Sequence, residues 1–214
     1  MNIVITGTSD GIGKATAEKF LSLGHKVFGI DVCDSTITDV NYIHIKKDIR
    51  DEELPNIENV DILINNAGIQ GKDEIDINLK GTINITEKYG IQPNIKSIVF
   101  NASASAITGA EFPEYAASKG GVVTYMKNTA LRIAKYGATS NAISPGGVKT
   151  KLNSHIMDNK DLWEQVLNES MLHKWAEPEE IADLIYYLSV INKSITGENI
   201  LIDNGEALKS NFIW

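Results

Sequence analysis

The sequence predicts an α/β protein with a doubly wound parallel sheet of about seven strands and helices on both faces. Short segments rich in Ile and Val alternate with helix-like segments from one end of the chain to the other. The first strand also runs directly into a glycine-rich turn and a helix. Repeated strand–helix–strand units of this kind give parallel strands. We find no internal repeat or linker, so we expect one domain over residues 1–214.

The elements follow from the same periodicities. Strands are expected near residues 2–6, 26–31, 42–46, 60–65, 96–101, 139–143 and 198–202. Helices are expected near residues 12–23, 73–90, 114–136, 151–169 and 178–191. The connections from Asp31 to Tyr42 and from Asp48 to Val60 barely hold a crossover helix, so we expect single turns or irregular loops there.

Composition excludes several classes of protein. The net charge of −8, with lysines scattered among acids, argues against nucleic-acid binding. Cys33 is the only cysteine, which excludes an internal disulfide and favours a reducing compartment. No apolar run approaches the roughly 20 residues of a membrane span, and the first residues read as a strand rather than a signal peptide. The four histidines lack metal-ligand spacing. We therefore expect a cytoplasmic protein without a metal site.

The turn Thr6-Gly7-Thr8-Ser9-Asp10-Gly11-Ile12-Gly13 lies between the first strand and the first helix, the context of a phosphate-binding loop. Gly7 allows the turn, Gly11 lets the backbone approach a pyrophosphate, and Gly13 permits close packing of helix on strand. The free N–H groups of the helix start then face the anion. This pattern predicts a dinucleotide site in which the loop residues Ser9, Asp10 and Ile12 take part.

Asp31 ends the second strand about twenty residues after the turn, where a carboxylate accepts hydrogen bonds from a ribose 2′-hydroxyl. A 2′-phosphate would place anion against anion there. Asp10 adds a second negative charge, and nothing basic follows in Val32-Cys33-Asp34. The sequence therefore predicts NAD rather than NADP. The alternative is that Asp31 is only a solvated acid at a strand end.

The spacing Tyr-x-x-x-Lys occurs twice, at Tyr115–Lys119 and at Tyr42–Lys46. Tyr42 lies in an alternating, strand-like run, where four residues span about 13 Å. Tyr115 opens a helix-like segment, where positions four apart are neighbours on one face. Only Tyr115 and Lys119 can therefore combine into a phenol beside an ammonium, which moves a proton to or from an alcohol oxygen.

Two further strand ends carry candidate cofactor residues. Asp48 and Ile49 follow the third strand, where they can flank an adenine. Asn66, Ala67 and Gly68 follow the fourth strand in the run Asn-Asn-Ala-Gly, whose small residues leave room for a ribose. Such a run is equally common as a structural turn.

Together these motifs resemble the classical short-chain dehydrogenase/reductase family over nearly the whole chain, which implies a Rossmann-like fold. The matching pieces are Thr6–Gly13, Asp48, Asn65–Gly68, Asn78 with Gly81, Tyr115–Lys119, Asn141–Thr150, Pro178–Ala182, Thr196–Glu198 and Asp203–Gly205. The spacing of the glycines in Thr6–Gly13 is G-x-x-x-G-x-G rather than the commoner G-x-G-x-x-G.

The resemblance implies catalytic roles. Tyr115 would act as general acid/base, and Lys119 would lower the pKa of its phenol and bind the nicotinamide ribose. Ser103 would hold the substrate oxygen, with Ser105 as the alternative in Asn-Ala-Ser-Ala-Ser. Asn78 would hold a water of the proton relay; otherwise it is a helix surface residue.

The resemblance also implies contacts after the sixth strand. In the segment that contains Pro145 and Gly146, the Val148 backbone would contact the nicotinamide carboxamide and Thr150 would cap it. Residues 151–175 should form a lid over the substrate, with apolar side chains that suit a hydrophobic alcohol or ketone or, alternatively, pack as core.

We therefore expect an NAD-dependent oxidoreductase that interconverts a secondary alcohol and its ketone. The alternatives are a 3-oxoacyl-thioester (acyl carrier protein) reductase and a non-catalytic NAD-sensing regulator, which would not need the Ser103–Tyr115–Lys119 set. The helices at 73–90 and 114–136 resemble surfaces through which family members form homodimers or homotetramers. The apolar run Phe212–Trp214 is a second candidate contact.

Overall fold

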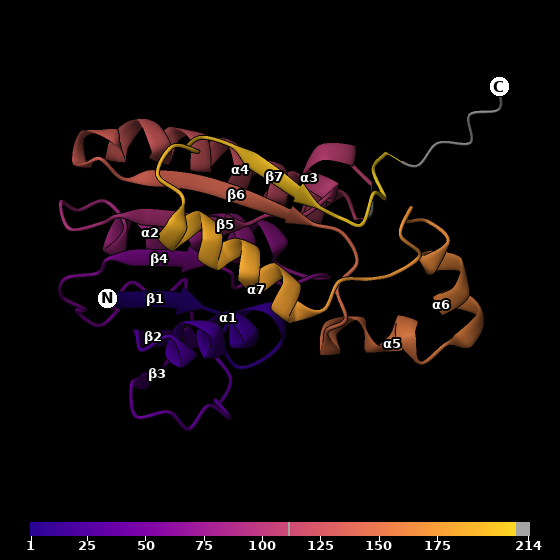
Figure 1. The fold of residues 1–214 in the computed structure, drawn as a ribbon, viewed down its shortest axis with the longest axis horizontal. Helices are drawn as coiled ribbons and strands as arrows, with labels where there is room; N and C mark the ends of the chain where they lie inside the picture. Colours follow the sequence, from indigo (N-terminus) through magenta and orange to yellow (C-terminus); the bar gives the residue numbers. More distant parts are fainter. Residues whose placement is uncertain (111, 209–214) are drawn as a thin grey trace.

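The computed structural model describes residues 1–110 and 112–208. They form a parallel sheet in the order β3-β2-β1-β4-β5-β6-β7 (Figure 1), which confirms the predicted fold class. The strands are β1 (Asn2–Thr6), β2 (Lys26–Asp31), β3 (Tyr42–Lys46), β4 (Ile62–Asn65), β5 (Ser97–Asn101), β6 (Thr139–Pro145) and β7 (Asn199–Ile202). Winding reverses between β1 and β4, and ligands of open α/β sheets bind at such a point, beyond the carboxyl ends of the strands.

Helices cover both faces of this sheet. The α-helices are α1 (Gly11–Ser22), α2 (Thr82–Tyr89), α3 (Ser105–Thr108), α4 (Pro113–Ile133), α5 (Ser154–Met157), α6 (Lys160–Leu167) and α7 (Pro178–Tyr186). Two π-helical segments, η1 (Ile75–Gly81) and η4 (Tyr187–Ile191), and two 3₁₀ turns, η2 (Ala134–Tyr136) and η3 (Lys151–Asn153), complete the set. Both α4 and α7 begin with a proline, whose missing N–H costs nothing in the first turn of a helix.

The strands divide their side chains between two apolar layers. Alternate residues of β1 show this clearly, because Val4 packs beneath α2 and α4 whereas Ile3 and Ile5 pack beneath α1 and α7. All three side chains are fully buried. A sheet covered on both faces explains why the central strands β1, β4 and β5 are nearly continuous apolar runs.

Two expectations for the connections have different outcomes. The segments 32–41 and 47–61 hold no helix, as their length predicts. The single helix expected over residues 151–169 is wrong, because the chain forms η3, α5 and α6 in succession. Asn159 begins α6 anew, since its side-chain oxygen accepts the Leu162 N–H at 3.2 Å. The short helix α3 was not expected.

The pieces η3, α5 and α6 lie beyond the carboxyl ends of the strands, which point toward them in Figure 1. Backbone bonds between residues 147–149 and Ala176 fasten the predicted lid, residues 151–175, to the end of β6. Trp175 packs directly on Gly147, where any β-carbon would overlap the indole. The ring of Trp163, from α6, meets Trp175 edge to face at 5.0 Å. Packing between two aromatic rings therefore joins α6 to the segment that follows it.

Candidate active site

The glycine turn between β1 and α1 adopts the geometry that its sequence predicts. Gly7 and Gly11 have φ angles of +74° and +54°, a region that glycine enters without strain. A β-carbon on Gly13 would overlap the carbonyl of Gly7, so the third glycine does permit close packing of helix on strand. Asp10 caps α1 and accepts the Gly11 N–H at 2.7 Å. The loop residues Ser9 and Ile12 lie on either side of this cap.

Asp31, at the end of β2, is fixed against the same turn. One carboxylate oxygen accepts the Ser9 N–H and the other accepts the Cys33 N–H, both at 2.9 Å. The carboxylate is therefore held by two backbone donors rather than left as a mobile surface acid. This placement joins the predicted ribose-binding acid to the predicted pyrophosphate loop.

A chain of hydrogen bonds crosses the carboxyl edge of the sheet from the glycine turn to Lys119. The Asn66 side-chain amide donates to the carbonyls of Thr6 and Gly7, at 3.0 and 3.2 Å. The Asn101 side-chain amide donates to the Asn66 side-chain oxygen at 2.9 Å. Lys119 Nζ then donates to the main-chain carbonyl of Asn101 at 2.9 Å. Hydrogen bonds thus connect the glycine turn, the segment after β4, the end of β5 and the helix α4.

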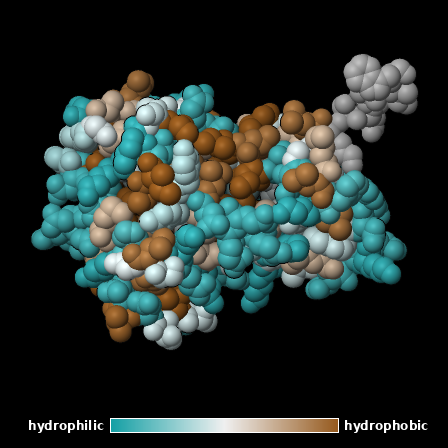
Figure 2. Space-filling view, viewed as in Figure 1, coloured by the Kyte–Doolittle hydropathy of each residue, from teal (hydrophilic) through white to brown (hydrophobic). Residues whose placement is uncertain are grey.

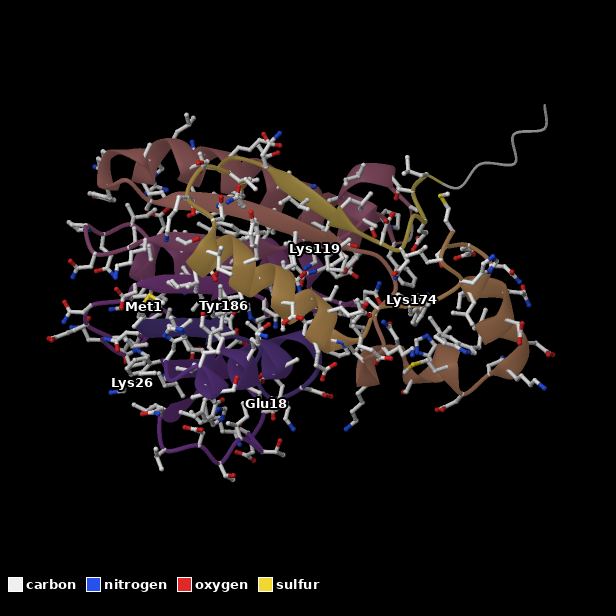
Figure 3. All side chains as sticks on the ribbon, in the orientation of Figure 1. Met1, Glu18, Lys26, Lys119, Lys174 and Tyr186 are labelled. Atoms are coloured by element: carbon white, nitrogen blue, oxygen red, sulfur yellow. The ribbon has the colours of Figure 1, made fainter. Side chains whose placement is uncertain are left out.

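Lys119 is a buried ammonium at the end of this chain. Burial in low-dielectric surroundings disfavours its charge and lowers the pKa of Lys119 to about 8. Figure 3 shows Lys119 in the middle of the molecule, whereas Lys174 lies out toward the lid. The ammonium lies 5.7 Å from the centre of the Tyr115 ring, one helical turn away on α4. The predicted pair is therefore adjacent, as helical spacing requires.

The two candidate serines lie together after β5. Their hydroxyl oxygens are 3.0 Å apart, and the Ser105 N–H donates to the Ser103 hydroxyl at 3.2 Å. Both side chains are buried, with Ser103 the more accessible of the two. The choice between Ser103 and Ser105 stays open.

Asn78 is not a helix surface residue. It is buried in the π-helical segment η1, and its side chain bonds to both backbone groups of Ile69 at 2.8 and 3.0 Å. Its amide also donates to the Ser118 hydroxyl on α4 at 3.1 Å. A β-carbon on Gly68 would lie 3.1 Å from Asn78 Oδ1 and 3.2 Å from Lys119 Nζ. Asn78, Gly68 and Lys119 therefore meet at one place.

The segment after β6 closes the same region. Pro145 ends β6, and its carbonyl accepts the Ala104 N–H at 2.8 Å, beside the two serines. Thr150 lies against the glycine turn, since a β-carbon on Gly11 would approach its methyl group to 3.1 Å. The Gly146 and Val148 backbones lie between these two contacts. The structure thus places the segment from Pro145 to Thr150, which was predicted to contact the nicotinamide, next to the glycine turn.

The two candidate residues after β3, Asp48 and Ile49, already make contacts within the protein. Asp48 is engaged by Arg50, whose guanidinium donates to both carboxylate oxygens, with Nη2 at 2.7 Å, and lowers the pKa of that carboxyl. The Ile49 side chain is buried against Gly81, which gives it a packing role. Ala67 lies against Gly7, where a β-carbon would approach its Cα to 2.9 Å. Contact of Asp48 or Ile49 with an adenine stays a prediction.

Sequence reasoning gave Asn101 and His44 no role in this region, set Tyr42 aside as a strand residue, and included Thr8 only as a member of the glycine turn. Asn101 was noted only as a neighbour of Ser103, and its partner Asn66 lies 35 positions away. An asparagine at the end of a central strand was the available signal.

Across the described ranges no cluster of His, Cys, Asp or Glu could hold a metal ion. No helix among these residues is long and apolar enough to cross a membrane.

A shallow hollow of about 520 Å³ opens elsewhere, at the amino edge of the sheet near Met1, Asn59 and Lys96. We do not assign function to it, because ligands of open α/β sheets bind at the carboxyl edge. The groups that can do chemistry also converge at that other edge.

An open parallel sheet that gathers a glycine turn, a tyrosine and a buried lysine at its carboxyl edge defines a class of oxidoreductase. A family model described as enoyl-(acyl carrier protein) reductase matches residues 7–206. The chain belongs to the short-chain dehydrogenase/reductase family and is an oxidoreductase.

Individual relatives agree with this assignment. The 3-oxoacyl-[acyl-carrier-protein] reductase FabG of Buchnera aphidicola is 30% identical, over 94% of this chain and 95% of its own. The FabG of Thermotoga maritima is also 30% identical, over 94% and 96%. A solved structure, a 4-hydroxyisoleucine dehydrogenase mutant complexed with NADH and succinate, is 28% identical with a TM-score of 0.88, over 99% of this chain and 100% of that one.

Proposed function

We propose that this enzyme interconverts a secondary alcohol and its ketone with NAD as the cofactor. The observation that carries the proposal is the bonded chain from the glycine turn through Asn66 and Asn101 to Lys119, with Tyr115 beside it. This arrangement links a dinucleotide loop to an acid/base pair in one region. The similar dehydrogenase complexed with NADH gives further support.

The residues present fit a dinucleotide. Gly7, Gly11 and Gly13 remove the side chains that would fill the loop, and the start of α1 supplies N–H groups for a pyrophosphate. Asp31 is preset to accept a ribose hydroxyl, and the negative charges of Asp10 and Asp31 would repel a 2′-phosphate. We therefore favour NAD over NADP. Bound there, the nicotinamide would supply or accept a hydride.

The side chains then handle the proton and the substrate oxygen. Tyr115 gives a proton to the oxygen in reduction and removes it in oxidation. Lys119 favours the phenolate by its charge and would bind the nicotinamide ribose. Ser103 donates to the substrate oxygen, with Ser105 bonded behind it. Asn78, buried and held by Ile69 and Ser118, positions a relay water near Lys119.

An apolar rim indicates the class of substrate. Large apolar side chains are exposed on the segments that follow β5, β6 and β7: Ile107, Phe112, Leu152, Met171, Leu172 and Leu208. Figure 2 shows apolar residues gathered between the body of the protein and the lid. Two of the cations near these segments, Lys149 and Lys174, are paired with Glu177 and Glu180. A neutral, hydrophobic alcohol or ketone matches this rim.

A 3-oxoacyl-thioester reductase is the second candidate, favoured by the names of the two relatives that are 30% identical. That activity usually goes with NADP, which the acids at Asp10 and Asp31 oppose. A panel of ketones, alcohols and 3-oxoacyl thioesters, assayed with each cofactor by the absorbance of the reduced nicotinamide, separates the candidates. Turnover of a thioester with NADPH alone would overturn the main proposal.

The catalytic assignment is tested by Tyr115→Phe. We expect NADH binding to persist while turnover falls by about 10²–10⁴-fold, the usual worth of a positioned acid/base. Tyr125→Phe is the matched control, because Tyr125 lies on the same helix but bonds to Glu87 at 2.7 Å. Unchanged turnover in Tyr115→Phe, or in-cell function that survives the change, would refute the assignment and favour a NAD-sensing regulator.

Assembly into dimers or tetramers through helices such as α4 stays a prediction, which light scattering tests. The apolar run at residues 212–214 lies outside the residues that the structure describes.

A further inference from the structure

The second Tyr-x-x-x-Lys run, on β3, has no part in the proposed chemistry, yet its side chains share one target. Positions 42, 44 and 46 alternate onto one face of the strand. The Tyr42 hydroxyl lies 2.8 Å from the Thr8 hydroxyl and 3.2 Å from Nδ1 of His44. His44 Nε2 lies 3.0 Å from the Cys33 carbonyl. These contacts all reach the glycine turn or the loop after β2.

Gly29 makes the reach of Tyr42 possible. It pairs with His44 in the β2–β3 register, and a β-carbon there would overlap both the Tyr42 hydroxyl and the Thr8 hydroxyl. The phenol therefore passes over β2 to the turn that follows β1. Any larger residue at position 29 would separate the two hydroxyls.

The loop that these side chains hold is the one that carries Asp31. The Asp31 carboxylate accepts the N–H groups of Ser9 and Cys33, and the Ser9 hydroxyl donates to the Cys33 carbonyl at 3.2 Å. The contacts of His44 and Tyr42 complete a ring that runs from the glycine turn through Asp31 and back. Movement of Tyr42 or His44 would thus loosen both donors of the carboxylate.

The partners also fix the direction of the hydrogen bonds. The Cys33 carbonyl can only accept, so Nε2 of His44 must carry the hydrogen. In the neutral ring Nδ1 then accepts from the Tyr42 hydroxyl, and the Thr8 hydroxyl donates to the Tyr42 oxygen. The hydrogen bonds therefore run in one direction, from the Thr8 hydroxyl through Tyr42 and His44 to the Cys33 carbonyl.

The missing crossover helix explains why the loop needs such support. Residues 32–41 form no helix or strand, so neither element orders the segment after Asp31. Ordering a loop costs about 1–2 kcal/mol of backbone entropy per residue. Side chains from β3 supply fixed points in place of a helix.

We propose that Tyr42 and His44 are positioning residues that hold the Asp31 carboxylate for the adenosine ribose and thereby favour NAD over NADP. The inference rests on the proposed function, because it assumes that Asp31 faces the ribose. A loosened carboxylate accepts the 2′-hydroxyl less well, while NADPH, which cannot use that bond, loses little.

Calorimetric titration with NADH and NADPH tests this without knowledge of the substrate. Tyr42→Phe removes one hydroxyl and keeps the ring, and we expect NADH to bind about three- to tenfold more weakly, the worth of a hydrogen bond. NADPH binding should change by less than about twofold, so the preference for NADH falls. Tyr89→Phe is the matched control, because its hydroxyl bonds to the Pro55 carbonyl.

Two variants of His44 separate positioning from general damage. His44→Leu should weaken NADH binding as Tyr42→Phe does, whereas His44→Gln, which offers a donor and an acceptor, should restore most of the affinity. Lys46→Ala should have no effect, because its ion pair with Asp34 is exposed.

Several results would overturn the inference. They are unchanged NADH binding in Tyr42→Phe, an equal loss in Tyr89→Phe, or equal losses of NADH and NADPH. If the wild-type protein binds neither dinucleotide, the proposed function fails and this inference fails with it. If the wild type binds NADH and the variants do not discriminate, only the inference fails.

Discussion

Replacement of Lys119 by methionine should remove activity yet leave the empty enzyme at least as stable as the wild type at neutral pH. The chain keeps an ammonium in a nearly inaccessible place, where burial lowers its pKa to about 8. Such a charge costs folding free energy, and the proposed catalytic role of Lys119 accounts for its retention. Methionine has a similar shape without the charge.

The magnitude follows from the pKa. A fall from 10.5 to about 8 corresponds to about 3 kcal/mol of unfavourable free energy for the charged form, at 1.36 kcal/mol per unit. Methionine leaves the Asn101 carbonyl without its donor, at a cost of about 1–3 kcal/mol. The net change at pH 7 should therefore lie between roughly zero and 2 kcal/mol in favour of Lys119→Met.

The pH dependence of unfolding separates these contributions. Between about pH 8 and the unfolded pKa of about 10.4, the unfolded state binds more protons at this site than the folded state does. The stability of the wild type relative to Lys119→Met should therefore rise across that window, by up to about 3 kcal/mol. Below pH 8 the difference should be constant, because both states are protonated.

Urea unfolding of both proteins at neutral pH and at several values up to about pH 10 measures this difference. Other titrating groups cancel in the comparison. A difference in unfolding free energy that stays flat across the window would refute the idea of a destabilised ammonium at Lys119. A variant several kcal/mol less stable at pH 7 would also refute it.

Two further predictions concern the lid and the serines. Gly147→Ala should displace the Trp175 indole, lower the free energy of unfolding by about 1–3 kcal/mol and alter tryptophan fluorescence. Gly120→Ala is the control, because its β-carbon would lie in open space. Thermal unfolding should show this variant to be as stable as the wild type or slightly more stable. Ser103→Ala should lower kcat about 10²-fold or more with little change in NADH affinity, and Ser105→Ala should cost less. A larger loss for Ser105→Ala in steady-state kinetics would reverse the two roles.

Local chemistry explains what the sequence alone could predict. The glycines of the turn, the acid at the end of β2 and the helical spacing of Tyr115 and Lys119 each depend on a few adjacent residues. Their geometry follows from backbone periodicity, and the structure places them as expected. The alternation of strands and helices likewise predicts a parallel sheet, whereas the order of its strands comes from the structure.

Contacts between distant segments were harder to predict. Nothing near Asn101 in the sequence indicates that its amide reaches Asn66, because the pairing depends on the register of β4 and β5. Tyr42 likewise contacts Thr8 only because Gly29 stands between them. The break before α6 was missed because apolar periodicity continues through Asn159, whose cap starts a new helix.

A structure of the enzyme with NADH bound would show whether Tyr115, Lys119 and the nicotinamide meet in one site. We expect the nicotinamide ring beside the Tyr115 hydroxyl, with Lys119 Nζ within hydrogen-bond distance of the nicotinamide ribose and the Asp31 carboxylate on the adenosine ribose. A nicotinamide placed away from Tyr115, or a dinucleotide outside the carboxyl edge of the sheet, would contradict it.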